Sequence, residues 1–198
     1  MARIRGVIFD MDGTLTEHYM DFQRLRHEMG IPTGDIVDHL MAADETERRR
    51  LDAILHRFEE DAAMNATLQP GVHELLAALR ARGIKLGLLT RNSRRSVAAL
   101  MARFDLGFDA TVTREDGPYK PSPQPVLAIA RQWGVSPAEV LVVGDYVHDL
   151  RCARDAGATG VLLINDRVPE WAKEAQHVVH KLQEVLALID RLEENPSA

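Results

Sequence analysis

The sequence predicts an α/β protein with a doubly wound parallel sheet and a small all-helical cap inserted after the first strand. Short runs rich in Val, Ile and Leu alternate with helical patterns over most of the 198 residues. Such near-continuous apolar runs are typical of parallel strands that helices cover on both faces. Residues 16–69 break this alternation, because they contain helical patterns and no strand signal. We therefore expect an α/β core formed by residues 1–15 and 70–198, with residues 16–69 as the cap.

The expected strands and core helices follow one another along the chain. The strands cover residues 5–10, 84–90, 109–113, 140–145 and 159–165. The helices cover Val72–Arg82, Arg94–Phe104, Gln124–Trp133 and Val147–Ala156. Gly83 and Gly134 stand where the left-handed end of a helix favours glycine. The last residues, 191–198, are expected to form a frayed tail.

The expected cap contains helical patterns at residues 21–30, 34–44 and 45–68. The arginine run 48–50 is interpreted as a solvated face that pairs with neighbouring acidic residues, and Arg24 and Arg26 are interpreted in the same way. His18, Tyr19 and Asp21 are assigned to hinge packing and helix capping rather than to substrate contact. An insert that follows the first strand would stand above the strand ends, as a lid.

Composition and charge limit the possible partners and location. A formal net charge of -6 disfavours nucleic acid and anionic membranes as main partners. Cys152 is the single cysteine, so no intramolecular disulfide forms, which fits a reducing compartment. The first apolar run ends at Asp10 and is too short for a signal sequence, and no segment has the length of a membrane span. We expect a cytoplasmic protein, as a monomer or a homodimer.

Acidic and polar residues gather where the predicted strands end. Parallel strands place their carboxyl ends at one edge of the sheet, so these side chains are expected to converge. Several carboxylates at one place repel one another and acquire a raised pKa unless a cation is present. Oxygen-rich sites of this kind hold Mg²⁺ together with a substrate phosphate. The residues are Asp10, Asp12, Thr90, Arg91, Asn92, Lys120, Asp145 and Asp149.

Four motifs carry a family resemblance. The stretches "DMDGTLT", "LLTRNS", "YKPSP" and "GDYVHD", in that order, resemble the four signature motifs of the haloacid dehalogenase superfamily. The helical insert after the first motif resembles the phosphoglycolate-phosphatase-like branch, whose small helical cap enters at this place. A lone DxD pair is a weak signal, whereas four motifs in order are specific. The resemblance covers the chain to about residue 165 and implies a Rossmann-like core.

The resemblance implies roles for the first motif. Asp10 would be the nucleophile that attacks phosphorus and forms an aspartyl-phosphate, and Asp12 would protonate the leaving alcohol and later deprotonate water. The spacing agrees with these roles, because alternate residues of an extended strand share a face. Gly13 would permit the sharp turn and bring backbone N–H groups close to the phosphate.

The second and third motifs would bind the phosphate. The Thr90 hydroxyl and the Arg91 N–H would donate to the phosphoryl group, and Lys120 would stabilise the charge of the transition state. Asn92 would add its amide, although a family Asn often follows the Thr directly. Gln124 stands where an acidic residue often follows the "KPxP" run.

The remaining carboxylates would serve the metal. The resemblance implies that Mg²⁺ is held by Asp10, Asp145 and the backbone carbonyl of Asp12. Asp149 would act through water or on Lys120.

These residues predict a Mg²⁺-dependent phosphatase for small phosphate monoesters, with phosphoglycolate-like compounds among its candidate substrates. The presence of Asp12 argues against a dehalogenase, which lacks an acid there. The absence of lysine from residues 16–69 argues against phosphonoacetaldehyde hydrolases, which use a cap lysine. Two alternatives stay open. A phosphosugar mutase uses the same motifs, and a non-catalytic binding protein can share the scaffold.

Overall fold

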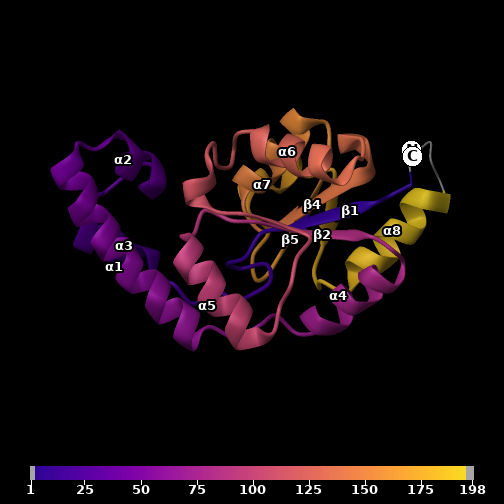
Figure 1. The fold of residues 1–198 in the computed structure, drawn as a ribbon, viewed down its shortest axis with the longest axis horizontal. Helices are drawn as coiled ribbons and strands as arrows, with labels where there is room; N and C mark the ends of the chain where they lie inside the picture. The colour runs from indigo at the N-terminus through magenta and orange to yellow at the C-terminus, as the bar shows by residue number, and fades with distance from the viewer. Residues whose placement is uncertain (1–2, 195–198) are drawn as a thin grey trace.

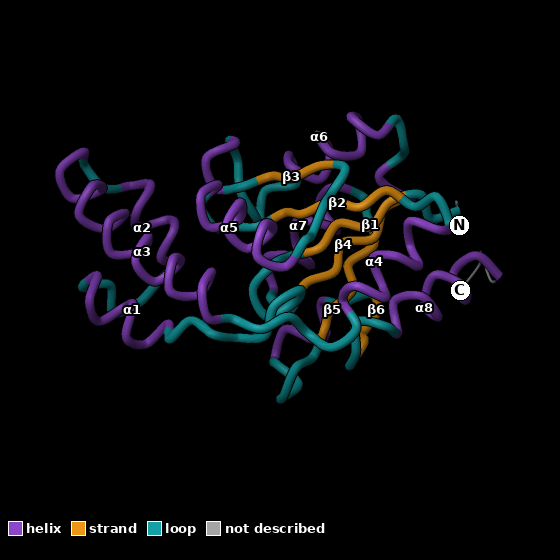
Figure 2. Tube along the Cα trace, turned by 60° about the horizontal axis from the view of Figure 1, so that its bottom comes forward, coloured by secondary structure: helices purple, strands orange, loops and turns teal. Residues whose placement is uncertain are grey.

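The protein contains one six-stranded sheet in which every neighbouring pair of strands is parallel. The structure, a computed structural model, describes residues 3–194. Along the sheet the order is β3-β2-β1-β4-β5-β6, as Figure 2 shows. The strands are β1 (Gly6–Phe9), β2 (Lys85–Leu89), β3 (Ala110–Val112), β4 (Val140–Gly144), β5 (Thr159–Leu163) and β6 (His177–Val179).

Helices cover both faces of the sheet, which confirms the predicted doubly wound fold. Figure 1 shows α6 and α7 on one face and α4, α5 and α8 on the other. The core helices are α4 (Val72–Ala81), α5 (Arg94–Phe104), α6 (Gln124–Trp133), α7 (Val147–Ala156) and α8 (Glu184–Glu194). Short 3₁₀ helices occur at Arg114–Asp116, Pro137–Glu139 and Glu170–Glu174. No helix within residues 3–194 has both the length and the apolar character needed to cross a bilayer.

The apolar strands form two core layers, because successive side chains point to opposite faces of the sheet. In β1, Val7 and Phe9 join the layer under α4, α5 and α8, whereas Ile8 joins the layer under α6 and α7. Gly6 allows the side chain of Trp133 to lie against the sheet, because a Cβ at this glycine would stand 2.4 Å from the Trp133 ring. The central strand is therefore fully buried on both faces.

Two elements near the C-terminus were not predicted from the sequence. Strand β6 is only three residues long, which is too short for a periodic signal. Helix α8 buries Val185, Leu188, Ile189 and Leu192, a stripe at helical spacing. The expectation of a frayed tail is therefore wrong for residues 191–194, which belong to α8, while residues 195–198 lie outside the described part of the chain.

Three helices between β1 and α4 form the insert: α1 (Phe22–Met29), α2 (Ile36–Ala42) and α3 (Glu45–Asn65). They enclose an apolar cluster of their own, which includes Leu25, Met29, Leu40, Leu51 and Leu55. Each helix begins at an aspartate whose carboxylate accepts backbone N–H bonds. The boundaries 16 and 69 of the predicted cap stay a prediction.

The charged surface of the insert agrees with its sequence. Asp21 is the N-cap of α1, as expected for a residue at the entry to the insert. Arg48 and Arg49 pair with Glu45, and Arg50 pairs with Glu47, so the arginine run forms the predicted solvated face.

Helix α3 lies along α5 and attaches the insert to the core. The Ser96 hydroxyl donates to the Glu59 carbonyl at 3.3 Å. Arg103 Nη1 donates to the carbonyls of Ala63 and Ala66, at 3.1 and 2.8 Å. The insert therefore stands beyond the carboxyl ends of the strands, on the left of Figure 1. Strands β1 and β4 meet there at the point where the strand order reverses, which is where open α/β sheets bind ligands.

Candidate active site

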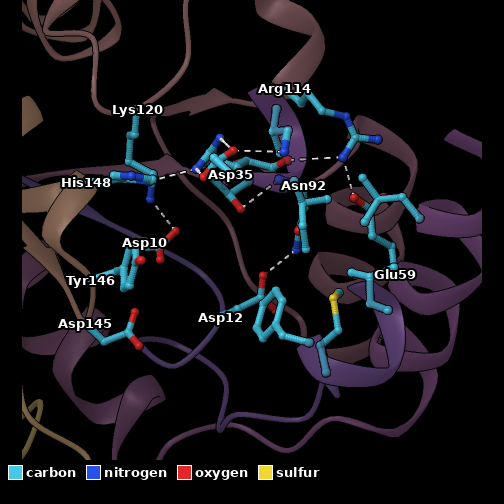
Figure 3. Close-up of a pocket in the computed structure, with 18 of the residues that line it drawn as sticks. Asp10, Asp12, Asp35, Glu59, Asn92, Arg114, Lys120, Asp145, Tyr146 and His148 are labelled. Atoms are coloured by element: carbon cyan, nitrogen blue, oxygen red, sulfur yellow. Dashed lines mark hydrogen bonds and ion pairs between the residues drawn. The ribbon is translucent and has the colours of Figure 1, made fainter. Parts of the chain in front are cut away.

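The predicted site residues lie around one cavity at the carboxyl edge of the sheet (Figure 3). Asp10 directly follows β1 and Thr90 directly follows β2. The N–H of Asp10 donates to the Val143 carbonyl at 2.9 Å, and the N–H of Thr90 donates to the Val112 carbonyl at 3.0 Å. These bonds extend the strand ladders by one residue and hold both residues at the sheet edge. The cavity has a volume of about 360 Å³, and the predicted residues lining it are Asp10, Asp12, Thr90, Arg91, Asn92, Lys120, Asp145 and Asp149.

Lys120 is buried between two carboxylates. Its side chain is 3% exposed, and its Nζ lies 2.5 Å from Asp10 Oδ1 and 2.6 Å from Asp149 Oδ1. Burial alone would lower the pKa of Lys120, but the two carboxylates outweigh it and raise this pKa above its usual value. The lysine therefore keeps its positive charge beside Asp10.

Asp149 serves Lys120 and the loop before α7. Its Oδ1 accepts from Lys120, and its Oδ2 accepts from the N–H of Tyr146 at 3.2 Å. Burial raises the pKa of Asp149 to about 7. Both carboxylate oxygens are thus engaged within the protein.

Three carboxylates form an oxygen cluster suited to a divalent cation. One oxygen from each of Asp10, Asp145 and Asp149 lies within 4.8 Å of the others. Burial raises the pKa of Asp10, and the charge of Asp145 raises it further against the lowering effect of Lys120. A cation would offset this cost, and an all-oxygen donor set fits Mg²⁺. Both oxygens of Asp149 accept hydrogen bonds, whereas Lys120 contacts one oxygen of Asp10 and His18 contacts one oxygen of Asp145. Asp10 and Asp145 are therefore the better ligand pair.

Asp12 lies beside Asp10 and accepts a hydrogen bond from Asn92. The distance from Asn92 Nδ2 to Asp12 Oδ2 is 2.6 Å. Burial, followed by the charge of Asp10, raises the pKa of Asp12 to about 7. A carboxyl with this pKa exchanges a proton near neutral pH, which suits a general acid and base. Asn92 was predicted to contact phosphate, and here its amide orients Asp12.

Gly13 allows the first motif to approach the fourth. Its φ is 74°, in the left-handed region that favours glycine. A Cβ at this position would lie 2.4 Å from Asp145 Oδ2 and 2.4 Å from His18 Cε1. The Gly13 carbonyl accepts from Asn165 Nδ2 at 2.7 Å. The glycine is therefore required by the close packing of the loop against Asp145.

His18 occupies a different environment from the one expected. The sequence assigns it to hinge packing, but its Nε2 lies 3.1 Å from Asp145 Oδ2, and the residue lines the cavity. A hydrogen bond to Asp145 raises the pKa of His18. Tyr19, its neighbour, does contact the insert, because its hydroxyl bonds to Asp61 at 3.2 Å.

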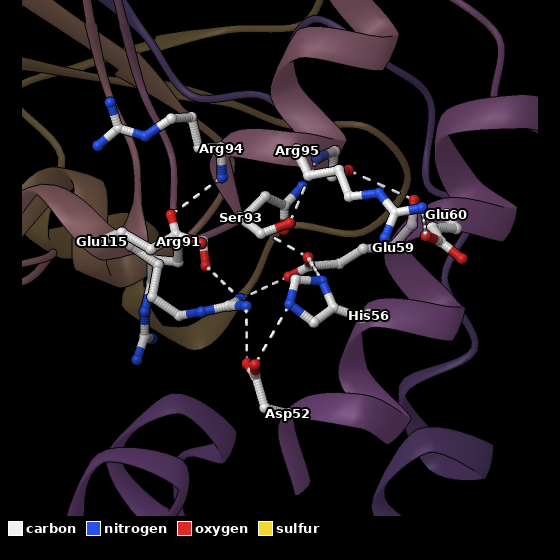
Figure 4. Close-up of polar contacts among 12 residues, drawn as sticks. Asp52, His56, Glu59, Glu60, Arg91, Ser93, Arg94, Arg95 and Glu115 are labelled. Carbon is white, nitrogen blue, oxygen red and sulfur yellow. Dashed lines mark hydrogen bonds and ion pairs between the residues drawn. The ribbon is translucent and has the colours of Figure 1, made fainter. Parts of the chain in front are cut away.

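A buried ion pair from the insert supports the loop after β2 (Figure 4). Glu59 of α3 and Arg114 have side chains that are 1% and 5% exposed, and their charged atoms lie 2.5 Å apart. Arg114 Nη1 also donates to the Arg91 carbonyl at 3.2 Å, and Glu59 Oε2 accepts from the N–H of Ser93 at 3.3 Å. Sequence reasoning missed both residues. The available signal was the place of Glu59 in the buried stripe of α3, after Leu51 and Leu55.

The side chain of Arg91 turns toward the insert. Its guanidinium makes two hydrogen bonds to Asp35, at 2.7 and 2.5 Å. Arg91 Nη1 also donates to His148 Nδ1 at 2.7 Å, and the guanidinium carbon lies 5.0 Å from the centre of the Tyr119 ring. The sequence predicted only a backbone role for Arg91, and it gave no signal for Asp35 or His148.

Comparison with known proteins shows which family the chain resembles. Residues 4–157 match the family of haloacid dehalogenase-like hydrolases. A haloacid dehalogenase-like hydrolase domain-containing protein of Arabidopsis thaliana is 35% identical over 82% of this chain and 71% of its own length. The N-acetylmuramic acid 6-phosphate phosphatase of Pseudomonas aeruginosa is 30% identical, and the match covers 96% of each chain. The phosphoglycolate phosphatase of Escherichia coli O157:H7 is 33% identical over 76% of this chain and 60% of that enzyme.

A solved structure supports the same assignment. The crystal structure of a hydrolase from Pseudomonas syringae matches with a TM-score of 0.80 and 25% identity, covering 95% of this chain and 99% of that one. The predicted Rossmann-like core and helical cap are therefore confirmed, as is the family resemblance. The chain belongs to the haloacid dehalogenase-like hydrolases, in the branch that contains phosphoglycolate phosphatases, and it is an enzyme of the phosphatase type.

Proposed function

We propose that this enzyme is a Mg²⁺-dependent phosphatase that hydrolyses small phosphate monoesters through an aspartyl-phosphate on Asp10. The observation that carries the proposal is the contact of Asp10 with the buried ammonium of Lys120, at the same cavity as Asp12 and Asp145. A cation held by Asp10, Asp145 and the Asp12 carbonyl would supply positive charge that draws the phosphate dianion to the carboxylates. The volume of about 360 Å³ is at the small end of the range for ligand sites.

In the first step, a carboxylate oxygen of Asp10 attacks phosphorus as the bond from phosphorus to the leaving oxygen breaks. Asp12 gives its proton to that leaving oxygen, so an alcohol departs. Lys120 stabilises the charge that develops on the phosphoryl group. The Thr90 hydroxyl is oriented for donation to the phosphoryl oxygens, because its oxygen already accepts from the N–H of Asn92 at 3.2 Å.

In the second step, water attacks the aspartyl-phosphate. Asp12, now a carboxylate, takes a proton from this water, and the bond between phosphorus and the Asp10 oxygen breaks. Phosphate leaves and the Asp10 carboxylate is restored, so both aspartates return to their starting states. The hydrogen bond from Asn92 keeps Asp12 directed at the reacting group through both steps.

Named relatives support a phosphatase that acts on small metabolites, since one acts on N-acetylmuramic acid 6-phosphate and another on phosphoglycolate. The substrate of this chain is accordingly expected to be a small phosphorylated metabolite rather than a nucleic acid or a membrane lipid. The cytoplasmic location predicted from the sequence fits such a substrate.

The test is release of phosphate from a panel of phosphate monoesters, with Mg²⁺ and then with excess EDTA. We expect turnover that depends on Mg²⁺ and disappears in the Asp10→Asn variant. Isomerisation of glucose phosphates without release of phosphate would instead assign a mutase. Binding of phosphate esters with no turnover under any condition would assign a non-catalytic binding protein.

A further inference from the structure

Arg26 of α1 lines the active-site cavity without a protein partner. Within residues 3–194, its side chain makes no hydrogen bond or ion pair, and its Nη1 is buried with no acceptor. Arg24, two residues earlier on the same helix, differs in both respects. It bonds to Glu28 at 2.9 Å, stacks over the Phe58 ring, and does not line the cavity.

The other lysine and arginine side chains that line the cavity are already paired with carboxylates. Arg91 is bound by Asp35 and Arg114 by Glu59. Lys120 is bound by Asp10 and Asp149. Among the described residues that line the cavity, Arg26 is thus the one whose guanidinium has no carboxylate beside it.

An unpartnered guanidinium nitrogen is costly to bury. A buried donor that loses water and gains no acceptor destabilises the folded protein, and the cost is greater for a charged group. When such a donor lies in a ligand cavity, a bound ligand can supply the missing hydrogen-bond acceptor. Arg26 lies one helical turn after Phe22, so both side chains occupy the face of α1 that lines the cavity.

The surroundings of Arg26 differ from those of the reacting carboxylates. Most of the cavity wall that the insert contributes is apolar, and its apolar residues are Met20, Phe22, Leu25, Ile36, Val37 and Leu55. Asp10, Asp12 and Lys120 come from the core. A phosphate ester whose phosphoryl group lies at the core carboxylates would direct its leaving group toward this apolar wall and Arg26.

We propose that Arg26 binds a carboxylate on the leaving group of the substrate, so that the enzyme selects phosphate esters of short organic acids. This inference rests on the proposed phosphatase function and adds the substrate class. Arg26 acts as a specificity residue, because it contacts the part of the substrate that is not transferred. A guanidinium suits this role, since its planar donors match a carboxylate.

A carboxylate fits the cavity better than a second phosphate group does. Six carboxylates line the cavity against four lysine and arginine side chains, so its charge before any cation binds is negative. A second dianion would face Arg26 alone, with Asp35 and Glu59 on the same wall. A single negative charge on a compact planar group meets less repulsion.

The experiment compares matched substrates in matched variants. 2-Phosphoglycolate carries the carboxylate, and 2-hydroxyethyl phosphate replaces it with a neutral CH₂OH group. We expect the wild-type enzyme to prefer the acid, and Arg26→Met to lower the ratio of kcat/KM for acid over neutral ester by about ten- to a hundredfold, mainly through KM. Arg24→Met is the control, and it should leave this ratio unchanged. Arg26→Lys should restore part of the preference.

Binding is measured separately, so that the result does not depend on turnover. Calorimetric titration of 2-phosphoglycolate into the Mg²⁺-loaded Asp10→Asn variant should show binding that weakens by a similar factor when Arg26→Met is added. The assignment of Arg26 is overturned if 2-phosphoglycolate binds the Asp10→Asn variant and the Asp10→Asn, Arg26→Met variant with equal affinity, or if it binds neither. If Arg26→Met weakened the binding of ethylene glycol bisphosphate more than that of 2-phosphoglycolate, Arg26 would be assigned to a second phosphate group instead of a carboxylate. Failure of catalysis with Arg26-dependent binding intact would reject only the proposed phosphatase function.

Discussion

The cavity has two walls that differ in how their charges are arranged. The core wall carries Asp10, Asp12 and Lys120, whose charged atoms contact one another or neighbouring side chains. Asp10 and Asp12 follow the buried strand β1, and Lys120 comes from the loop before α6. The insert wall is mostly apolar, and its acidic residues Asp35 and Glu59 are bound to arginines of the core. The core wall therefore carries the residues that we assign to phosphoryl transfer. The insert wall fixes the shape of the cavity and leaves Arg26 available for the substrate.

The largest expected effect comes from the core wall. Asp10→Asn removes the nucleophile and keeps the shape of the side chain, so we expect kcat to fall by more than about a thousandfold with every substrate. Folding should persist, because Lys120 retains Asp149 as its partner. The measurement is phosphate release, together with the thermal unfolding midpoint. Ordinary activity in this variant with Mg²⁺ would show that Asp10 is not the nucleophile.

The second effect tests how firmly the insert wall is attached. Glu59→Ala removes the buried carboxylate beside Arg114 and leaves its guanidinium with the half-exposed Asp52 at 3.3 Å. We therefore expect the free energy of unfolding to fall by about 3 kcal/mol, the low end of the cost of breaking a buried ion pair. The measurement is urea unfolding. The activity of the folded fraction should fall as well, because the pair holds the Arg91 carbonyl and the Ser93 N–H.

The control replaces both members of this pair. The Glu59→Leu, Arg114→Met double variant removes both charges and keeps similar volume, so it should regain most of the lost stability. It should not regain activity in full, because neither leucine nor methionine can form the hydrogen bonds to the Arg91 carbonyl and the Ser93 N–H. If Glu59→Ala were as stable as the wild-type protein, the pair of Glu59 and Arg114 would contribute nothing to the attachment of the insert, which would rest on its other contacts with the core.

The two walls also differ in how well the sequence predicts them. Most of the core wall follows from local patterns, because the motifs that contain Asp10, Thr90 and Asp145 come directly after apolar runs and parallel strands bring their ends together. Lys120 lies in a loop and was placed by the order of the motifs. The order of the strands, and strand β6, did not follow from these patterns, since a three-residue strand has no measurable period.

The insert wall could not be predicted, because its contacts depend on how α1, α2 and α3 dock on the core. Arg24 and Arg26 are two residues apart and look alike in the sequence, yet one faces Glu28 and the other faces the cavity. Asp35 caps α2 in the structure, but its pairing with Arg91 joins residues far apart in the chain. Helix periodicity identifies a face, and only the packing decides what that face meets.

A smaller effect is expected where the second ion pair joins the walls. Asp35 and Arg91 have side chains that are 24% and 17% exposed, so solvent screens their interaction more than that of Glu59 and Arg114. Asp35→Asn removes the charge and keeps the capping oxygen of α2, and we expect a loss of about 1 kcal/mol in urea unfolding. Asp44→Asn, at the cap of α3, is the matched control and should cost less. A loss as large as that of Glu59→Ala would remove the distinction between the two pairs.

The smallest effect concerns His148, which lies where the two walls meet. Its Nδ1 accepts from Arg91, so the imidazole is neutral with its proton on Nε2, and burial together with Arg91 lowers the pKa of His148 to about 4. As pH falls from about 6.5 to about 4, His148 becomes protonated in the unfolded chain and stays neutral in the folded protein. Because the unfolded state then binds one more proton, the free energy of unfolding decreases over this range. His148→Gln keeps an acceptor for Arg91 and cannot titrate, so its stability should depend less steeply on pH between these values, as urea unfolding at several pH values would measure. Identical slopes in both proteins would mean that His148 is protonated in the folded state, in which case it could not accept from Arg91 or join the insert wall to α7.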